Sequence, residues 1–184
     1  MKIRTSIAAV VALGEAALAC HKGEPVSTTQ TTSATLEKPA LTDEDRAFIT
    51  KVTQSGMLEV ALGEHAARQA SARDVRELGE AMVIHHSLAE EELRNLAASR
   101  GVSVPAEMDP DHRATYDKLA KLRGEKLDRE YADDVVSDHE RDVNELEAAA
   151  RDLKDPELRA WAAKTLPAFE GQLERARALA RKPE

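Results

Sequence analysis

The sequence has 184 residues, a formal net charge of -8 and only 3% aromatic residues. This length suffices for one folded domain together with an export segment. An acidic chain repels nucleic acid, so no nucleic-acid partner is expected. The single cysteine excludes an intramolecular disulfide.

Residues 1–19 are typical of a signal peptide. Lys2 and Arg4 give a positively charged start, a short apolar run follows, and small residues precede Cys20. The position of the cysteine resembles that in bacterial lipoprotein signals, which implies a lipid anchor on Cys20 and a membrane as partner. Because no aspartate follows the cysteine, an exported, periplasm-facing protein anchored to the outer membrane is expected. The alternative is ordinary cleavage after Ala19, which would release a soluble periplasmic or secreted protein.

Residues 20–41 are expected to form a flexible tether that begins with the lipidated cysteine. They are rich in Ser and Thr, contain Pro25 and Pro39, and lack aromatic residues. Such a segment buries too little apolar surface to offset the entropy that is lost on ordering. Residues 42–182 then remain as the folded domain.

An all-α domain is predicted by the strong helix formers Ala, Leu, Glu and Arg and by apolar residues that recur at steps of three and four. Thr42 is the expected N-cap of the first long helix, and the second begins near residues 71–74 and ends before Gly101. Asp109 and Asp155, each followed by proline, mark two further helix starts.

The start at Asp109 opens a short extra helix, which Gly124 separates from a third long helix over about residues 125–152. Short connections between long helices favour antiparallel neighbours. The expected fold is therefore an antiparallel up-down-up-down four-helix bundle, with the short extra helix before helix 3.

The predicted inward face of each long helix carries one polar residue near its midpoint: Glu59, His86, His139 and Gln172. In an up-and-down bundle the midpoints lie at one height, so these residues are expected to form one layer, with His85 on its flank. Burying a polar group without partners costs about 2–7 kcal/mol. The four side chains should therefore either satisfy each other or hold a ligand.

Two interpretations of this layer follow. In the first, a buried hydrogen-bond network fixes the register of the helices. In the second, Glu59, His86 and His139 bind one zinc or iron ion, because two histidines and one carboxylate are a known ligand set, and Gln172 and His85 support them. The sequence favours the network, because it lacks the Glu-x-x-His spacing of di-iron centres.

Catalytic motifs are missing from the sequence. It contains no glycine-rich phosphate loop and no specific Ser/His/Asp arrangement, so a non-catalytic protein is expected. The acidic residues of the third long helix are interpreted as a solvated face; they are Asp133, Asp134, Asp138 and Asp142.

Four short motifs resemble those of the bacterial exported family called domain of unknown function 4142, over about residues 43–181. The resemblance implies a ferritin-like helical bundle that is often exported or lipid-anchored, and it implies no chemistry. Two positions depart from the family: His85 stands where Asp is usual, and Gln172 stands where His is usual, which weakens the metal-binding alternative. The motifs are Glu59-Val60 ahead of Leu62-Gly63, Met82-Val83 ahead of His86, Val135-Val136 ahead of Asp138-His139, and Leu166-Pro167 ahead of Ala176.

The expected function is a structural, interaction or stress-related role in the cell envelope, with an unknown envelope protein as partner. The alternative is an envelope metal-binding protein that uses Glu59, His86 and His139.

Overall fold

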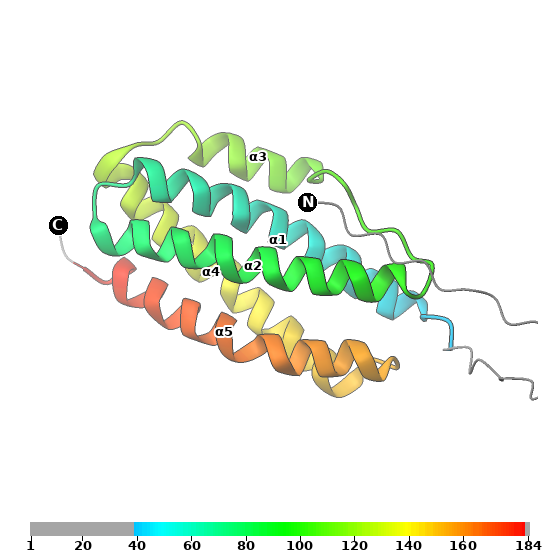
Figure 1. Cartoon of the computed structure of the whole chain (residues 1–184). Helices are drawn as coiled ribbons and strands as arrows, with labels where there is room; N and C mark the ends of the chain where they lie inside the picture. The colour runs from blue at the N-terminus through cyan, green and yellow to red at the C-terminus, as the bar shows by residue number, and fades with distance from the viewer. Residues whose placement is uncertain (1–38, 183–184) are drawn as a thin grey trace, which may run out of the picture. The chain divides into compact units, whose positions relative to one another are not determined.

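The computed structural model describes residues 39–182, in which all regular secondary structure is helical. The prediction of an all-α domain is confirmed. The expected signal peptide, Cys20 and the expected tether as far as residue 38 lie outside the described residues. Within the described part, no helix has the length and apolar character needed to cross a bilayer. The helices are α1 (Asp43–Gln69), α2 (Arg73–Ala98), α3 (Pro110–Leu119), α4 (Gly124–Asp152) and α5 (Pro156–Ala180) (Figure 1).

Capping residues fix where three of the helices start. The Thr42 hydroxyl accepts a hydrogen bond from the Asp45 amide at 3.1 Å, and the Asp45 carboxylate accepts one from the Thr42 amide at 2.9 Å. Asp109 and Asp155 accept hydrogen bonds from the first amides of α3 and α5, and each precedes a proline. The predicted starts of α1, α3 and α5 are therefore confirmed.

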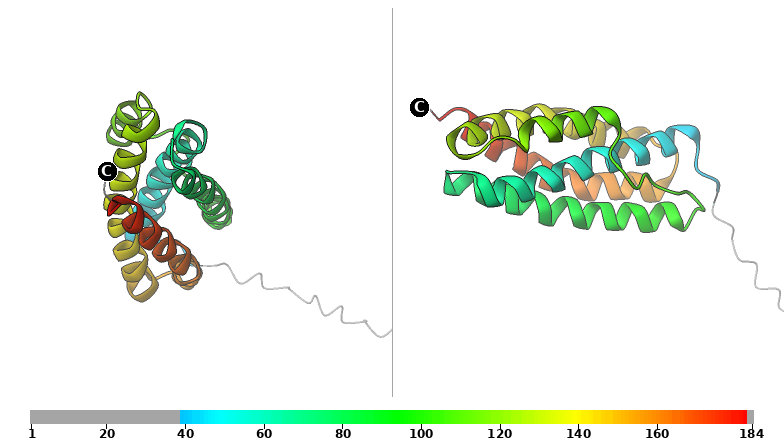
Figure 2. Two further views of the ribbon diagram at one scale, coloured as in Figure 1. Left: turned by 90° about the vertical axis from the view of Figure 1, so that its left-hand side faces the viewer. Right: turned by 90° about the horizontal axis from the view of Figure 1, so that it is seen from above.

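The four long helices surround the core, and α3 lies outside this group. Helices α1 and α5 each pack against both α2 and α4, whereas α3 packs mainly on α1. The views in Figure 2 show the long helices side by side along their length. Apolar side chains fill both halves of the core, with Phe48, Leu93 and Trp161 toward the start of α1 and Leu62, Leu78 and Leu127 toward its end.

The direction of α4 differs from the up-down-up-down alternation that the sequence predicted. Residues 99–123 return along α1, where the Gln54 side chain bonds the backbone of Glu107 and Asp109 at 3.0 and 2.7 Å. Helix α4 therefore starts at the same end as α2 and runs parallel to it (Figure 1). Neighbouring long helices are still antiparallel, as their cross-helix contacts require. The prediction failed because it treated this long segment as a local connection.

Helices α1 and α2 approach closely where two glycines face each other. A Cβ atom on Gly79 would lie 2.6 Å from the carbonyl oxygen of Gly63, and one on Gly63 would lie 2.8 Å from that of Gly79. Both distances are shorter than a Cβ contact permits, so this backbone contact requires glycine on each helix. It sets the spacing of the two helices that carry Glu59 and His86.

Arg100 joins three segments at the end of the bundle where the described chain begins. Its guanidinium pairs with Asp155 at 2.5 Å and with Glu157 at 3.1 Å, and it donates to the Pro39 carbonyl at 3.1 Å. Asp155 is also the N-cap of α5. One side chain thus holds the C-terminal end of α2, the start of α5 and the first described residues together.

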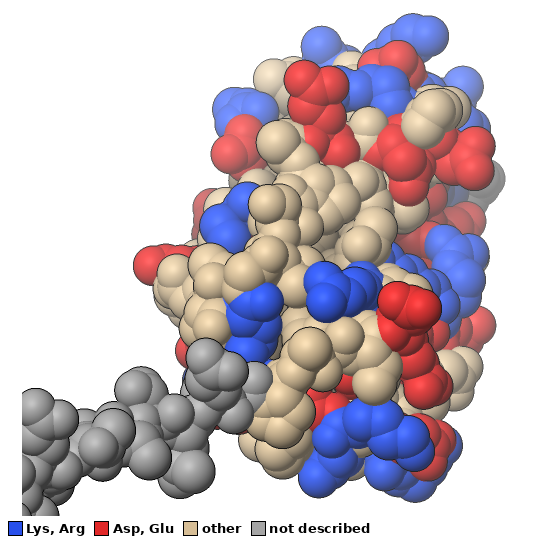
Figure 3. Space-filling view, turned by 90° about the vertical axis from the view of Figure 1, so that its right-hand side faces the viewer, with Lys and Arg blue, Asp and Glu red and all other residues tan. Residues whose placement is uncertain are grey.

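The same end of the bundle presents a mixed surface. Figure 3 shows uncharged residues over much of the middle of this face, with some basic residues among them and both basic and acidic residues toward the edges. Nucleic-acid binding requires a basic patch or stripe, and this face does not provide one.

Candidate functional site

The four polar residues predicted to form a layer all lie in the core, one on each long helix. Glu59 on α1 and His139 on α4 have no exposed surface, and His86 on α2 and Gln172 on α5 are each 2% exposed. Helical periodicity turns each of them inward, between the apolar clusters at the two ends of the bundle. Their polar atoms therefore face each other and the core instead of water.

His139 lies at the centre of the layer. Its Nε2 is 3.2 Å from the side-chain oxygen of Gln172, and its Nδ1 is 3.8 Å from Oε1 of Glu59. An amide oxygen only accepts hydrogen bonds, so we assign the ring proton to Nε2, which leaves a lone pair on Nδ1. Gln172 donates in turn to the carbonyl oxygen of Ala81 at 3.5 Å, which links α4 through α5 to α2.

Phe169 on α5 packs against both histidines of the layer. Its ring centroid lies 4.4 Å from that of His86 and 5.3 Å from that of His139, and the two imidazoles are 5.4 Å apart. This aromatic contact keeps water from the imidazole faces. Periodicity alone does not identify Phe169 as part of the layer, because the contact depends on which helices are neighbours.

Burial sets the protonation states of the layer. It raises the pKa of Glu59 well above its usual range, and nearby aspartates raise it further by repulsion. It lowers the pKa of His139 to about 4. It also lowers the pKa of His86 well below its usual range, with repulsion from His139 acting in the same direction. At neutral pH both imidazoles are therefore uncharged, and burial favours the protonated form of Glu59.

Some polar atoms of the layer lack a hydrogen-bond partner among the described residues. They are both carboxyl oxygens of Glu59, Nε2 of His86 and Nδ1 of His139. Carboxylate oxygens and imidazole nitrogens are ligand types that bind zinc and iron. Their arrangement does not fit one ion, because within residues 39–182 no three His, Cys, Asp or Glu side chains are grouped so as to hold a metal. The structure thus brings the predicted ligands Glu59, His86 and His139 near each other, but their ligand atoms do not point to one common metal position.

Two interpretations of polar residues outside the layer need correction. His85, expected on the flank of the layer, is exposed to solvent on α2. The predicted solvated acidic face is wrong at Asp138, which is 7% exposed, and at Asp142, which accepts a hydrogen bond from the Ser55 hydroxyl at 2.7 Å. The sequence signal for this second contact was Ser55 itself, a polar residue on the inward stripe of α1.

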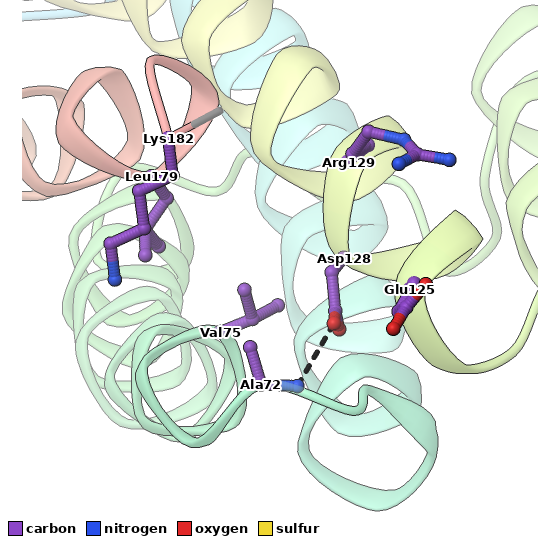
Figure 4. Close-up of a pocket in the computed structure, with 7 residues that line it drawn as sticks. All are labelled: Ala72, Val75, Glu125, Asp128, Arg129, Leu179 and Lys182. Atoms are coloured by element: carbon purple, nitrogen blue, oxygen red, sulfur yellow. Dashed lines mark hydrogen bonds between the residues drawn. The ribbon is translucent and has the colours of Figure 1, made fainter. Parts of the chain in front are cut away.

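The polar layer has little free space beside it. A cavity of about 10 Å³ adjoins His86, which is at most the space of one water molecule. A cavity of about 490 Å³ lies instead at the end of the bundle where α2 and α4 start (Figure 4). At its edge the Asp128 carboxylate accepts hydrogen bonds from the Ser71 and Ala72 amides at 2.8 and 2.9 Å. Asp128 thereby holds the turn that precedes α2, whose own N-cap residue supplies no side-chain hydrogen bond.

Comparisons with known proteins agree with this architecture. A family model described as "Domain of unknown function (DUF4142)" matches residues 30–179. Among solved structures, the chain is similar to a DUF305 fragment from Deinococcus radiodurans, with a TM-score of 0.68 and 17% sequence identity over 78% of this chain and 100% of the fragment. At that identity the likeness shows the fold alone. No curated protein matches the sequence.

Proposed function

The chain belongs to the DUF4142 family, and we propose that it is a non-catalytic lipoprotein of the cell envelope that acts by binding a partner protein. In this proposal Cys20 carries the lipid anchor, and residues 21–41 hold the domain away from the membrane. The helical bundle presents the binding surface, and the polar layer serves the fold.

The observation that carries the proposal is the closed state of the polar layer. Its members are at most 2% exposed, and the cavity beside them measures about 10 Å³. A group that acts on a substrate must come within hydrogen-bond reach of it. Closure therefore supports a structural role for Glu59, His139 and Gln172 and supports the proposal that the protein acts through the outer faces of the helices.

A ferritin-like arrangement of the bundle is part of the same proposal. Ferritin-like folds carry one long crossover connection, which makes two of the four helices parallel. The segment between α2 and α4 supports this assignment, because it returns along α1 before α4 begins.

The anchor is tested by lipid labelling. Labelled palmitate should enter the wild-type chain and be absent from the Cys20→Ser variant, which should also leave the membrane fraction. An unlabelled wild-type chain in the soluble fraction would identify the protein as periplasmic or secreted and remove the anchor from the proposal.

The binding role is tested with a photo-crosslinking residue placed in living cells at one exposed position of each outer helix. We expect one dominant adduct of fixed mass from a single face. No adduct from any position, or the same mixture from all of them, would refute the role. The positions are Ser87 on α2, Asp117 on α3, Glu147 on α4 and Glu170 on α5.

A second candidate function, metal binding, is favoured by the unsatisfied atoms of Glu59, His86 and His139. It requires these side chains to move together onto one zinc or iron ion, because their present arrangement does not fit one. Elemental analysis after loading with each metal tests it, with His86→Ala combined with His139→Ala as the control. About one metal per chain, lost in the control, would establish the metal site; no retained metal in the wild type would exclude it.

A further inference from the structure

The outer face of α2 carries an exposed apolar pair. Ile84 and Leu88 are each 57% exposed, and they lie one helical turn apart on the same face. Helix α2 packs against α1 and α5 through its other faces, and α3 lies on α1 without covering this one (Figure 1). Single exposed apolar residues are ordinary on a protein surface. Two adjacent ones on an uncovered helix form a continuous apolar strip.

Acidic residues bracket this apolar pair. Glu80 lies one turn before Ile84, and Glu91 lies nearly one turn after Leu88. Both glutamates are exposed, and neither has an ion-pair partner within residues 39–182. Other glutamates of the same helix are paired with basic residues. The two carboxylates that remain are about 16 Å apart along the helix.

From this surface we infer that the α2 strip (Glu80, Ile84, Leu88 and Glu91) binds an amphipathic helix of the partner protein. The inference rests on the proposed binding role and names its surface and its partner class. The partner helix carries two apolar residues one turn apart, with a lysine or arginine beyond each. Steps of four, four and three keep the strip on one face of α2 over three turns, so the partner lies along α2 at a shallow angle.

A second copy of this chain fits the strip less well. Parallel pairing of two copies brings Glu80 and Glu91 each opposite its own equivalent. Antiparallel pairing about the apolar residues brings Glu80 opposite Glu92 of the second copy, whose Lys164 is already paired with that carboxylate. Like charges at these positions oppose association. The same glutamates repel an anionic lipid surface. Charge therefore selects a basic partner helix.

The test is a fluorescence-anisotropy titration, in which the full chain, purified after processing in cells, is added to a labelled helical peptide. The peptide has the pattern Lys-x2-Leu-x3-Leu-x3-Lys, in which an antiparallel helix meets the strip from Glu91 to Glu80. Replacing both apolar residues, Ile84→Ser with Leu88→Ser, should weaken binding by at least about tenfold. Replacing both charges, Glu80→Gln with Glu91→Gln, should weaken binding and reduce its dependence on salt.

A matched control makes the same charge change elsewhere. The pair Glu147→Gln with Glu170→Gln lies on exposed positions of α4 and α5 and should leave the Kd unchanged. All substituted positions are exposed, so each variant should keep the wild-type melting temperature. If the apolar variant nevertheless unfolds, the charge variant and its control still decide the question.

Several results would overturn the inference. The lysine peptide could fail to bind the wild type. It could bind the Ile84→Ser, Leu88→Ser variant as tightly as the wild type. A peptide with glutamates in place of the lysines could bind the wild type as tightly as the lysine peptide does. Dimerisation of the wild type that the apolar variant loses would assign the strip to a second copy. Binding to anionic vesicles that the apolar variant loses would assign it to a membrane.

The crosslinking experiment separates this inference from the proposed binding role. A dominant adduct from Glu147 or Glu170, with none from Ser87, would keep the binding role and overturn the α2 strip. A dominant adduct from Ser87 that the charge variant of the strip abolishes would support both.

Discussion

Lowering the pH from 7 to 4 should reduce the free energy of unfolding, in part through His139. Burial lowers the pKa of His139 in the folded chain from its ordinary value of 6.5 to about 4. Between these values the unfolded chain binds a proton that the folded chain does not. The stabilisation is therefore complete above pH 6.5 and is lost as the pH falls toward 4. The difference of 2.5 between the two pKa values (6.5 minus 4) corresponds to about 3 kcal/mol.

Urea unfolding of the wild type and of His139→Gln at pH 7 and pH 4 measures this contribution. Glutamine removes the titrating ring and keeps a polar side chain in the layer. The variant loses some stability at both pH values because packing and hydrogen bonds change. Its further loss between pH 7 and pH 4 should be smaller than that of the wild type by about 3 kcal/mol. Leu146→Val, at a buried position of the same helix, is the control and should follow the pH dependence of the wild type.

Parallel pH dependence in the wild type and His139→Gln would refute this reasoning. It would mean that His139 binds protons equally in the folded and unfolded chains, so that its ring is hydrated or charge-paired in solution. The lowered pKa of His86 has the same sign and the raised pKa of Glu59 has the opposite sign, and both groups are present in the wild type and in the variant. The difference between the two proteins reports His139 together with its repulsion of His86.

Three further substitutions test other parts of the structure by equilibrium unfolding. Glu59→Gln should gain stability relative to the wild type as the pH rises from 4. The reason is that the carboxyl of Glu59 loses its proton at a lower pH in the unfolded chain than in the folded chain, which destabilises the wild type as the pH rises. An equal dependence of the unfolding free energy on pH in both proteins would contradict this. Gly79→Ala should destabilise the fold by about 1–3 kcal/mol, because its Cβ would lie 2.6 Å from a backbone oxygen. Gly171→Ala, with open space around it, is the control, and equal effects would rule out the close approach. Asp128→Ala should lower the free energy of unfolding by about 1–3 kcal/mol through loss of its two hydrogen bonds to the turn before α2, and an unchanged value would show that these bonds are dispensable.

Local chemistry was enough to predict where helices start and which residues face inward. Thr42, Asp109 and Asp155 cap the amides that follow them, and this interaction needs only a few adjacent residues. The burial of Glu59 and His139 follows from the spacing of apolar residues on one helix at a time. These features do not depend on which helices are neighbours.

Features that depend on which helices are neighbours could not be predicted from the sequence. The direction of α4 follows from contacts that Gln54 makes with a segment more than fifty residues away. The burial of Asp138 and the bond from Ser55 to Asp142 depend on how α1 faces α4. Whether Glu59, His86 and His139 converge on one ion depends on how side chains from three helices are placed relative to one another, which residue spacing does not fix.

A mechanical consequence follows from the position of Arg100. A pull that enters the domain at Pro39 acts directly on this guanidinium and not only on the first turn of α1. Through Asp155 and Glu157 the load passes to the start of α5, and through the chain itself it passes to the end of α2. The hydrogen bond from Arg100 to Pro39, with the ion pairs behind it, therefore adds to the contacts that must break before the start of α1 can be pulled away.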